Sequence, residues 1–330
     1  MFWGVRAVLS DIMPTACRAA SAIAAGISHE LMEPSSTHLP CLLSKYEVDF
    51  GSLVGSGTFS KVWQCWPKEC SQNEPVSLVV KVLSLCDTLP PGVHHPLHSL
   101  GEVHLQSRMQ HTHIVAHVDY IEDLYFVGHI LEACRGGTLF DAVNHQISVH
   151  DRGLEFLDST TFAMHIVSAM LYLKQCNVVH RDIKLENIFL KFSAEFPIAW
   201  NTYVLGDFGS ATLASTLEKN PSRVGSWAYM APEVLCGVRY GHEVDVWSLG
   251  VAWCTSLIAD LPFEQPYLAT IQSKWGNGSL ALDNDLWQSL PTAGKLVIAE
   301  CLTIEPTHRV SVEGLPAKID MLSQRQCSGH

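Results

Sequence analysis

The first residues along the chain whose pattern could serve a binding site form a glycine-containing segment between two strand-like runs, Gly55-Ser56-Gly57-Thr-Phe-Ser60-Lys-Val62. Glycines let the backbone of a hairpin approach phosphate groups closely. A lysine, Lys81, stands inside the otherwise apolar run 78–83. A buried ammonium there needs a partner, because an unpaired one is costly. Each feature has an alternative: an ordinary hairpin turn for the glycines, and an edge-strand lysine that faces water.

Three further motifs follow along the chain. They are His180-Arg181-Asp182-Ile-Lys184-Leu-Glu186-Asn187, just after a helical stretch, then Asp207-Phe208-Gly209, and finally Ala231-Pro232-Glu233. The order and spacing of the glycine segment, the strand lysine and these motifs resemble those of the eukaryotic protein kinase family. Lys184, two residues after Asp182, resembles the serine/threonine type. The resemblance covers roughly residues 46–322.

This resemblance implies a serine/threonine protein kinase, which transfers the γ-phosphate of ATP to protein hydroxyls and uses Mg²⁺. In such a site Lys81 grips the α- and β-phosphates, and Glu102 on the next helix is its partner. Asp182 accepts or orients the proton of the substrate hydroxyl, mainly by positioning. Lys184 contacts the γ-phosphate.

The resemblance also implies the ligands of the metal and of the adenine ring. Asn187 and Asp207 supply the hard oxygen ligands that suit Mg²⁺. The other nucleotide-binding positions are Val54, Gly55, Ser56 and Gly57 in the glycine segment, Val62, Val79 and Phe189 around the ring, and Glu132 and Cys134 along its edge. An aromatic Phe189 narrows the floor of the pocket in one interpretation and is plain core packing in the other.

The segment 207–233 corresponds to the activation segment of the family. Arg181, beside the catalytic aspartate, has a guanidinium that can pair with a phosphate on this segment. Ser222 aligns with the usual phosphorylation position, and Ser226 with the residue that contacts the catalytic aspartate. Rival phosphorylation sites are Ser215 and Thr216. In the alternative, Arg181 only caps its loop and no phosphate is needed.

Several other positions are expected to be structural. Glu233 and Arg309 resemble a buried ion pair that anchors the end of the activation segment, and breaking it would strand a charge. Asp245 is expected to hold the backbone around His180 and Arg181. Residues 191–203 are an insertion, which we expect to form an extended hairpin on the large lobe.

Two polar residues occupy positions where the family usually stacks apolar groups between its lobes. They are Gln106, four residues after the helix glutamate, and His117 in the next strand. Buried polar groups need hydrogen-bond partners. One hypothesis is that Gln106 and His117 bond to each other and that protonation of His117 loosens the active alignment. In the alternative, a register offset turns Leu105 and Val118 inward.

Seven histidines fall between residues 94 and 117. The pairs His94/His98 and His113/His117 have the spacing of neighbours on a helix, where two imidazoles can bind a metal. Residues 113–117, however, align with the start of a strand, where that geometry fails. An exposed polar loop and helix face is the interpretation we prefer.

The elements that must position these groups follow from hydrophobic periodicity. Strand-like runs are 46–54, 61–66, 76–83 and 124–131, interrupted by a helical stretch at 97–109, whereas 160–175 and 244–258 are helical. This order predicts an α+β, bilobal fold. We expect a β-rich small lobe with one main helix over 46–132, a helical large lobe over 136–322, and a short tail at 323–330.

Residues 1–45 differ from the rest and are expected to be an extension and linker. Residues 1–27 are rich in Ala, with Arg6 and Arg18 against a single acid, Asp11. Such a stretch fits a mitochondrial presequence, a weak secretory signal, or a flexible or partly helical extension. The chain contains no unbroken apolar run of membrane-spanning length.

Composition excludes some classes of protein. The 330 residues are 47% hydrophobic, which supports a sizeable core, and the net charge of −12 argues against binding to a phosphate backbone as the main activity. Eleven cysteines without a framework spacing indicate reduced thiols in an intracellular protein, cytoplasmic or nuclear. We therefore expect protein substrates with Ser/Thr acceptors, no nucleic acid and no stable membrane insertion, and we leave the oligomeric state open.

Two other functions compete with a protein kinase. A pseudokinase scaffold would bind nucleotide or a partner without turnover, and only the polar interlobe positions favour it. A small-molecule kinase would not need Lys184 or the Ala231-Pro232-Glu233 segment, which build a peptide platform. Glu186 matches an acid that selects basic residues upstream of the target, whereas Thr138 stands where some such kinases carry an acid.

Overall fold

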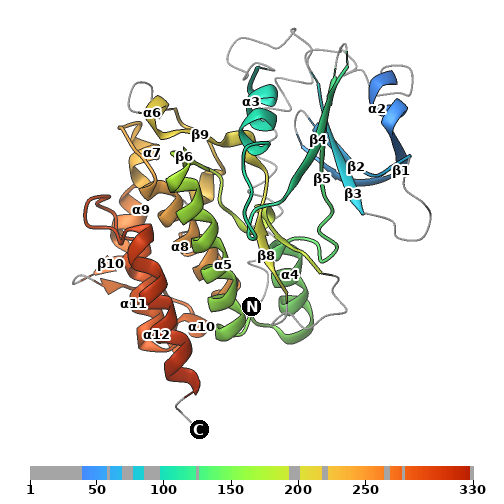
Figure 1. The fold of residues 1–330 in the computed structure, drawn as a ribbon. Coiled ribbons are helices and arrows are strands. Elements are labelled where there is room, and N and C mark those ends of the chain that lie inside the picture. Colours follow the sequence, from blue (N-terminus) through green and yellow to red (C-terminus); the bar gives the residue numbers. More distant parts are fainter. Residues whose placement is uncertain are drawn as a thin grey trace, which may run out of the picture.

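The computed structural model describes residues 39–57, 60–68, 77–84, 97–123, 126–192, 201–217, 222–263, 268–276 and 279–327. The predicted targeting segment, residues 1–27, lies outside the described residues, as do His94 and the middle of the expected hairpin, residues 193–200. The described chain forms a small lobe built on a sheet and a larger helical lobe (Figure 1). The protein therefore has the predicted α+β, bilobal fold.

The small lobe contains a five-stranded antiparallel sheet with the order β1-β2-β3-β5-β4. Its strands are β1 Tyr46–Ser56, β2 Ser60–Pro67, β3 Leu78–Ser84, β4 His117–Glu122 and β5 Phe126–Glu132. The four predicted strand-like runs overlap β1, β2, β3 and β5. Strand β4 begins later than expected: residue 114 forms only an isolated bridge to Leu205, and the ladder starts at His117.

The two faces of this sheet are covered by different helices, α3 (Leu97–Gln106) on one side and α2 (Pro40–Lys45) on the other (Figure 1). Side chains alternate along a strand, so Val79 and Lys81 share one face of β3 and Val80 lies on the other. Val80 and Leu42 of α2 belong to one buried cluster, and a Cβ on Gly128 would lie 3.3 Å from the Leu42 side chain, so the missing side chain makes room for α2. The face that carries Val80 is therefore buried, whereas the face that carries Val79 and Lys81 is half-buried.

Helix α2 lies within the segment expected to be a linker, ahead of the predicted lobe boundary at Tyr46. Leu39 and Leu42 are completely buried in the apolar cluster on the face of the sheet that carries Val80. The carboxylate of Asp123, after β4, accepts hydrogen bonds from the backbone N–H groups of Cys41 (3.0 Å) and Leu42 (3.2 Å). Residues 39–45 are thus packed and capped as a part of the small lobe.

We expect Leu42→Ala to destabilise the protein by about 2–4 kcal/mol, because it leaves a cavity between α2 and the sheet. Urea denaturation of the full chain measures this change in the free energy of unfolding. Cys41→Ala is the matched control, since the Cys41 side chain is exposed on the same helix. Equal stability of the Leu42→Ala variant and the control would show that α2 contributes nothing to the fold.

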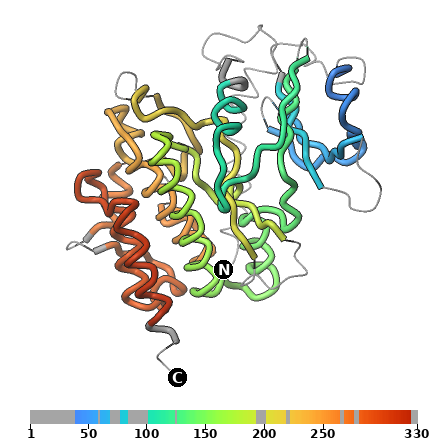
Figure 2. The backbone as a smooth tube through the Cα atoms, in the orientation of Figure 1, coloured from blue at the N-terminus to red at the C-terminus, as the bar shows by residue number. Residues whose placement is uncertain are grey.

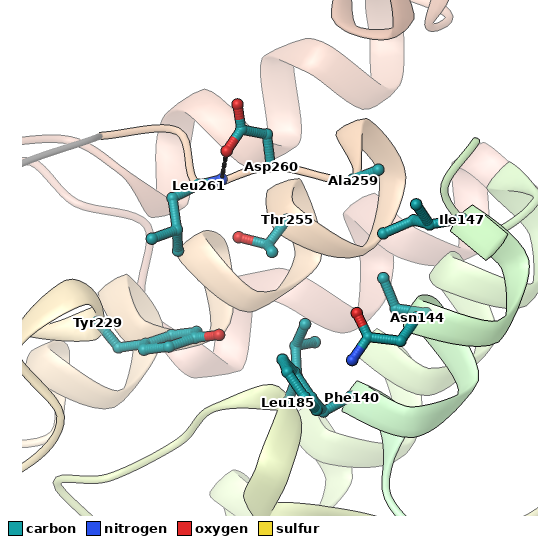
Figure 3. Close-up of a pocket in the computed structure, with 10 residues that line it drawn as sticks. Phe140, Asn144, Ile147, Leu185, Tyr229, Thr255, Ala259, Asp260 and Leu261 are labelled. Carbon is teal, nitrogen blue, oxygen red and sulfur yellow. Dashed lines mark hydrogen bonds between the residues drawn. The ribbon is translucent and has the colours of Figure 1, made fainter. Parts of the chain in front are cut away.

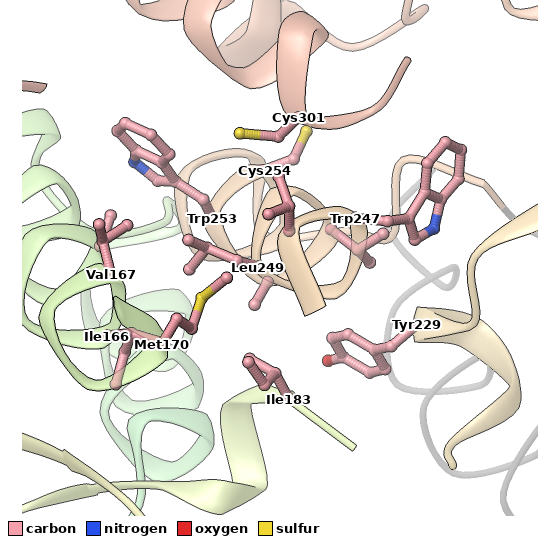
Figure 4. Close-up of a cluster of buried hydrophobic side chains, with 14 of the residues drawn as sticks. Ile166, Val167, Met170, Ile183, Tyr229, Trp247, Leu249, Trp253, Cys254 and Cys301 are labelled. Carbon is pink, nitrogen blue, oxygen red and sulfur yellow. The ribbon is translucent and has the colours of Figure 1, made fainter. Parts of the chain in front are cut away.

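The large lobe is built around two long helices, α5 (Phe156–Gln175) and α8 (Glu243–Ile258). Fifteen consecutive residues of α8 are buried, from Val244 to Ile258, so this helix forms the centre of the lobe. Figure 4 shows side chains of α5, among them Ile166 and Met170, pointing toward α8, with Cys301 of a third helix on the other side. This core supports the loop that carries His180 and Asp182.

The chain crosses from the small to the large lobe between β5 and α4, as the tube in Figure 2 shows. The further helices are α4 Leu139–His150, α6 Ala214–Leu217, α7 Pro232–Cys236, α9 Leu268–Ser273, α10 Asp285–Ser289, α11 Thr292–Cys301 and α12 Leu315–Cys327, with 3-10 turns η1 Leu185–Asn187, η3 Phe208–Ser210, η4 Trp227–Tyr229 and η5 Val312–Gly314. Short strand pairs are β6 Val178–Val179 with β9 Thr212–Leu213, β7 Ile188–Leu190 with β8 Tyr203–Leu205, and β10 Trp275–Gly276 with β11 Ser279–Leu280. The β7–β8 pair is the described base of the expected hairpin.

Among the described helices, α5 has the length and apolar composition needed to cross a membrane. Half of its most apolar window is buried within the protein, where α5 packs against α8 and α12. A core helix passes the same test of length and composition, so α5 is explained by its place in the large lobe.

Candidate active site

Lys81 lies at the centre of a three-residue charge cluster between the lobes. Its Nζ is 2.7 Å from Oε1 of Glu102 on α3 and 2.8 Å from Oδ1 of Asp207, which precedes η3 in the large lobe. Burial by itself would lower the pKa of Lys81, but the charges of Glu102 and Asp207 outweigh it and raise that pKa. The Lys81 ammonium in turn lowers the pKa of Asp207 to about 2. The predicted partner of Lys81 is therefore confirmed, and the lysine does not face water.

The sheet face that carries Lys81 also carries the residues predicted around the adenine ring. Val62 lies opposite Lys81 in the β2–β3 register, and Val79 lies opposite Leu131 of β5. Directly opposite residues share a face of the sheet. Val62 and Val79 are half-buried there, while Phe189, also half-buried, comes from β7 of the large lobe.

The glycine segment forms the tip of the β1–β2 hairpin. Gly55 pairs with Val62, and the N–H of Gly57 donates to the carbonyl of Ser60 at 2.8 Å. Val54 is about half exposed, and a Cβ at Gly55 would meet no atom within 4 Å. Ser56 pairs with Lys61 at the end of the described ladder.

The connection between the lobes is tied by the carboxylate of Glu132 at the end of β5. It accepts the backbone N–H of Ala116 at 2.9 Å and lies 2.8 Å from Nζ of Lys191, after β7. The Glu132 side chain is therefore engaged by protein groups, which leaves only its backbone for the predicted adenine contact. Cys134 is half-buried two residues later, and burial raises the pKa of its thiol to about 12.

Asp182 is held by hydrogen bonds on both carboxylate oxygens. Oδ1 accepts from the N–H of Ser226 at 2.7 Å, and Oδ2 accepts from Nδ2 of Asn187 at 3.0 Å. Lys184 Nζ is 3.1 Å from the same Oδ2 and 2.6 Å from Oγ of Ser226. The predicted contact between Ser226 and Asp182 is therefore present, and these contacts hold the Asp182 carboxylate in one orientation.

The two residues predicted to bind Mg²⁺ have suitable oxygen atoms. Nδ2 of Asn187 donates to the carbonyl of Asp182 at 2.9 Å and to its carboxylate, and this fixes the amide so that its oxygen is the remaining ligand atom. The side chain of Asp207 is 43% exposed, and its Oδ1 bonds to Lys81. Mg²⁺ commonly takes one or two carboxylates and completes its shell with phosphates and water. This donor set fits the ion.

Arg181 fastens the activation segment to the loop that carries Asp182. Its Nε donates to the carbonyl of Ser210 at 2.6 Å and its Nη1 to Oγ of Ser222 at 2.8 Å. Tyr240, which sequence reasoning missed, donates its hydroxyl to the carbonyl of Ser222. The rival phosphorylation sites Ser215 and Thr216 are exposed on α6 and lie apart from this contact.

Two structural pairs predicted from the sequence are present. The guanidinium of Arg309 binds the Glu233 carboxylate through two hydrogen bonds of 2.6 and 3.0 Å, both side chains being almost fully buried. Asp245 accepts the backbone N–H groups of His180 and Arg181, each at 2.8 Å. The first pair holds α7 against the segment that follows α11, and Asp245 joins α8 to the loop of His180 and Arg181.

The predicted hydrogen bond between Gln106 and His117 is wrong. Gln106 is buried, and its Nε2 donates to the carbonyl of Val115 at 2.9 Å, whereas Nδ1 of His117 lies 3.0 Å from Nε2 of His129. The alternative register is also wrong, since Val118 is 47% exposed. The reason is that β4 begins at His117 and its side chain faces β5 rather than the end of α3.

His129 was missed because its partner depends on the strand register. It lies opposite Lys81 in the β3–β5 ladder and is fully buried. The one signal in the sequence was the presence of a histidine inside the otherwise apolar run 124–131. Burial lowers the pKa of His129 to about 3, so this imidazole is neutral beside Lys81.

The His113/His117 pair does not form a metal site, and the His94/His98 pair cannot be followed because His94 lies outside the described residues. His113 lies in the connection before β4 and stacks on His165 of α5, while His117 contacts His129. In the part of the chain that the structure describes, no group of three or more His, Cys, Asp or Glu side chains could hold a metal ion.

A small pocket opens on the large lobe beside η1, a few residues from Asp182. Figure 3 shows Phe140 and Asn144 of α4 facing Tyr229 of η4, with Thr255 near the end of α8 between them. Within the described residues, Oγ1 of Thr255 has no hydrogen-bond partner, and neither has Oε2 of the neighbouring loop residue Glu186. The pocket is therefore lined largely by apolar side chains, with the buried hydroxyl of Thr255 in its wall, whereas Glu186 is not one of its lining residues.

Comparison with known proteins identifies the family. Residues 48–318 match the model of the protein kinase domain, so the chain belongs to the protein kinase family and is of the serine/threonine type. It is similar to Serine/threonine-protein kinase DCLK2 of Rattus norvegicus, with 28% identity over 272 residues, which is 81% of this chain. It is also similar to Cell cycle serine/threonine-protein kinase CDC5/MSD2 of Saccharomyces cerevisiae, with 32% identity over 216 residues, which is 64% of this chain. The chain spans about one third of the length of these two relatives, 33% and 29%.

A third relative has a shorter chain. It is the Calcium/calmodulin-dependent protein kinase cmkA of Emericella nidulans, which is 29% identical over 267 residues, 80% of this chain and 59% of its own length. The three relatives share a kinase description and differ in the rest of their names.

Proposed function

We propose that this protein is an active kinase, which transfers the γ-phosphate of ATP to serine and threonine hydroxyls of proteins. The observation that carries the proposal is the position of Lys81, which contacts Glu102 of the small lobe and Asp207 of the large lobe at once. This contact is made only when the helix, the sheet and η3 are mutually aligned. Phosphoryl transfer depends almost entirely on such positioning and on charge stabilisation.

The chain's own residues suit each requirement of that reaction. The nucleotide supplies the phosphoryl group and Mg²⁺ neutralises its charge. Lys81 and Lys184 place two cations on either side of the cleft, and Asp207 and Asn187 would hold the metal. Asp182, fixed by Ser226 and Asn187, would orient the acceptor hydroxyl.

A protein is the acceptor that this site suits. Ser226, which contacts both Asp182 and Lys184, belongs to the activation segment, so the segment lies directly beside the acceptor position. The pocket between α4, η4 and α8 is next to it. Glu186 lies in η1 beside the loop of Asp182, and its carboxylate would attract a basic side chain of the substrate, in line with the expectation from its sequence position; its Oε2 is buried and would have to become exposed to bind it.

A pseudokinase scaffold is the second candidate, and one observation favours it. In the described residues the buried Oε1 of Gln106 and Nδ1 of His129 have no hydrogen-bond partner, although both lie on the side of the sheet that faces α3. Unsatisfied buried polar atoms destabilise an arrangement. The two unsatisfied atoms would therefore destabilise the arrangement in which Lys81 contacts both Glu102 and Asp207, which catalysis needs.

Labelled ATP separates the two candidates. Incubation of the purified chain with γ-labelled ATP, Mg²⁺ and a mixed basic protein should yield labelled protein with phosphoserine or phosphothreonine. A pseudokinase would bind the nucleotide without labelling, and a small-molecule kinase would label only a small acceptor. Binding of nucleotide without any protein labelling would overturn the proposal.

We expect phosphorylation of Ser222 to raise activity toward peptides by about tenfold or more. A phosphate there would add charge-assisted hydrogen bonds to the guanidinium of Arg181, which already contacts Ser222 Oγ. The measurement is kcat/KM for a peptide before and after phosphatase treatment, in the wild type and in Ser222→Ala. Ser215→Ala on exposed α6 is the control. A phosphate-free Ser222→Ala protein with the rate of the phosphorylated wild type would contradict this prediction.

A further inference from the structure

Three histidines gather where the connection between α3 and β4 crosses the large lobe. The ring of His113 stacks on that of His165 of α5, with centroids 4.1 Å apart and planes 17° from parallel. The ring of His111 stacks on Tyr172 of α5, with centroids 5.1 Å apart. His111 and His113 come from the histidine-rich segment 94–117, and the kinase site uses none of the three rings.

Backbone hydrogen bonds fix where the protons lie on these rings. The N–H of Tyr203 in β8 points to Nδ1 of His165 at 3.3 Å, and the N–H of His113 points to Nδ1 of His111 at 3.1 Å. An amide N–H can only donate, so both of these ring nitrogens must be free of protons. Conversely, Nδ1 of His113 faces the carbonyl of Tyr203 at 3.0 Å and must donate.

Protonation would therefore break specific contacts. A second proton on His165 or on His111 would sit on the nitrogen that now accepts, and two donors would face each other. It would also place a positive charge against the stacked ring of His113. The geometry is compatible only with neutral His111 and neutral His165.

This cluster is joined to α3 through a short series of hydrogen bonds. The N–H of Leu205 in β8 donates to the carbonyl of His113, and the N–H of Val115 donates to the carbonyl of Leu205, both at 2.9 Å. The carbonyl of Val115 then accepts Nε2 of Gln106, which lies one turn after Glu102 on α3. The residues that hold the connection on the large lobe thus also locate the partner of Lys81.

We propose that the stack of His113 and His165 is a proton-operated anchor: its neutral rings hold the α3–β4 connection on the large lobe and so position α3, and protonation frees the connection. His113 and His165 act through α3 and are positioning residues. The proposal rests on the proposed function where activity is the readout, but it also makes a prediction for stability that needs no activity.

The charged and titratable groups around the rings come from several elements. They are His111 on the same connection, Tyr172 and Asp158 on α5, Tyr203 on β8 and Lys191 after β7. Lys191 lowers the pKa of His113, and Asp158 acts on Tyr203 rather than on a ring of the cluster. Within the described residues no carboxylate therefore stabilises the charged form of His113 or His165.

The pKa values agree with the geometry. Burial, followed by the charge of His113, lowers the pKa of His165 to about 4, and burial also lowers the pKa of His111 and of His113. A histidine whose pKa is lower in the folded than in the unfolded protein stabilises the fold least in acid. The neutral rings thus give their full stabilisation above about pH 6.5, the ordinary pKa of histidine. This stabilisation decreases as the pH falls toward the lowered pKa values of the folded protein. Each such imidazole changes the equilibrium between the anchored and the freed connection by up to about tenfold per pH unit.

The test is the double variant His113→Asn/His165→Asn. An Asn side chain can place a donor or an acceptor near the position of Nδ1, and it does not titrate in this range. We expect kcat/KM for a peptide to fall several-fold less between about pH 7 and about pH 5.5 in the double variant than in the wild type. His150→Asn, which removes an exposed histidine at the end of α4, should keep the wild-type profile.

Thermal unfolding across the same pH range gives a second readout. The melting temperature of the wild type should fall more steeply in acid than that of the double variant. Parallel melting curves for the two proteins, or an NMR titration that places the pKa of His165 above its ordinary value, would overturn the anchor. If the wild type transfers no phosphate at any pH, the proposed function fails, and the melting curves still decide the anchor.

Discussion

Asp182→Asn should lower kcat for protein phosphorylation by about 10²–10⁴-fold, which is the usual contribution of a positioned acid–base group. The substituted amide keeps the size of the carboxylate, and its oxygen can still accept the N–H of Ser226. It carries no negative charge and cannot take a proton from the substrate hydroxyl. The loss should therefore fall on the transfer step rather than on folding.

Binding of the nucleotide should survive this substitution. Lys81, Glu102 and Asp207 form their own cluster, and within the described residues Asp182 makes no hydrogen bond or ion pair with any of the three. We expect the dissociation constant of a fluorescent ATP analogue with Mg²⁺ to change by less than about threefold. Initial rates of peptide phosphorylation at saturating ATP then measure the expected loss in kcat.

Asp283→Asn is the matched control, because Asp283 is exposed in the segment before α10. This variant should match the wild type in rate and in nucleotide binding. An Asp182→Asn protein that keeps most of the wild-type rate would exclude the proposed role of Asp182. Activity in neither the wild type nor any variant would favour the pseudokinase scaffold.

Glu233→Gln should destabilise the protein by about 3–5 kcal/mol, the usual cost of removing one partner of a buried ion pair. The guanidinium of Arg309 is completely buried and lies 5.1 Å over the ring of Trp247. Its other acceptors are backbone carbonyls, those of Glu243, Thr303 and Ile304. Carbonyls carry no net charge, so the cation would be left without a counter-charge.

The free energy of unfolding from urea denaturation measures this effect, and the melting temperature should fall by several degrees. Glu313→Gln is the matched control, since Glu313 forms a surface ion pair with Lys174 in which both side chains are largely solvated. Surface pairs contribute about 0–1 kcal/mol. If both Glu→Gln variants unfold with the same free energy, the buried pair is not an anchor of the activation segment.

The sequence alone determined the family and the main elements of the fold. Apolar alternation marked four strands of the sheet, and the helical period marked α5 and α8, because these signals depend only on which residues are buried. The order of the motifs then implied that Glu102 is the partner of Lys81, that Arg309 is the partner of Glu233, and that Asp245 holds the loop of Asp182. Each of these contacts is present.

Only the tertiary structure decided the contacts that depend on register and on packing between distant segments. The partner of His117 is His129, because β4 begins at residue 117 and pairs with β5 in a register that no local pattern specifies. Helix α2 is part of the small lobe, because Asp123, more than 80 residues away, caps it. The stack of His113 on His165 likewise joins residues that are brought together only when α5 and the α3–β4 connection pack. The sequence determines which side chains are present, but the packing of the whole chain determines which of them come into contact.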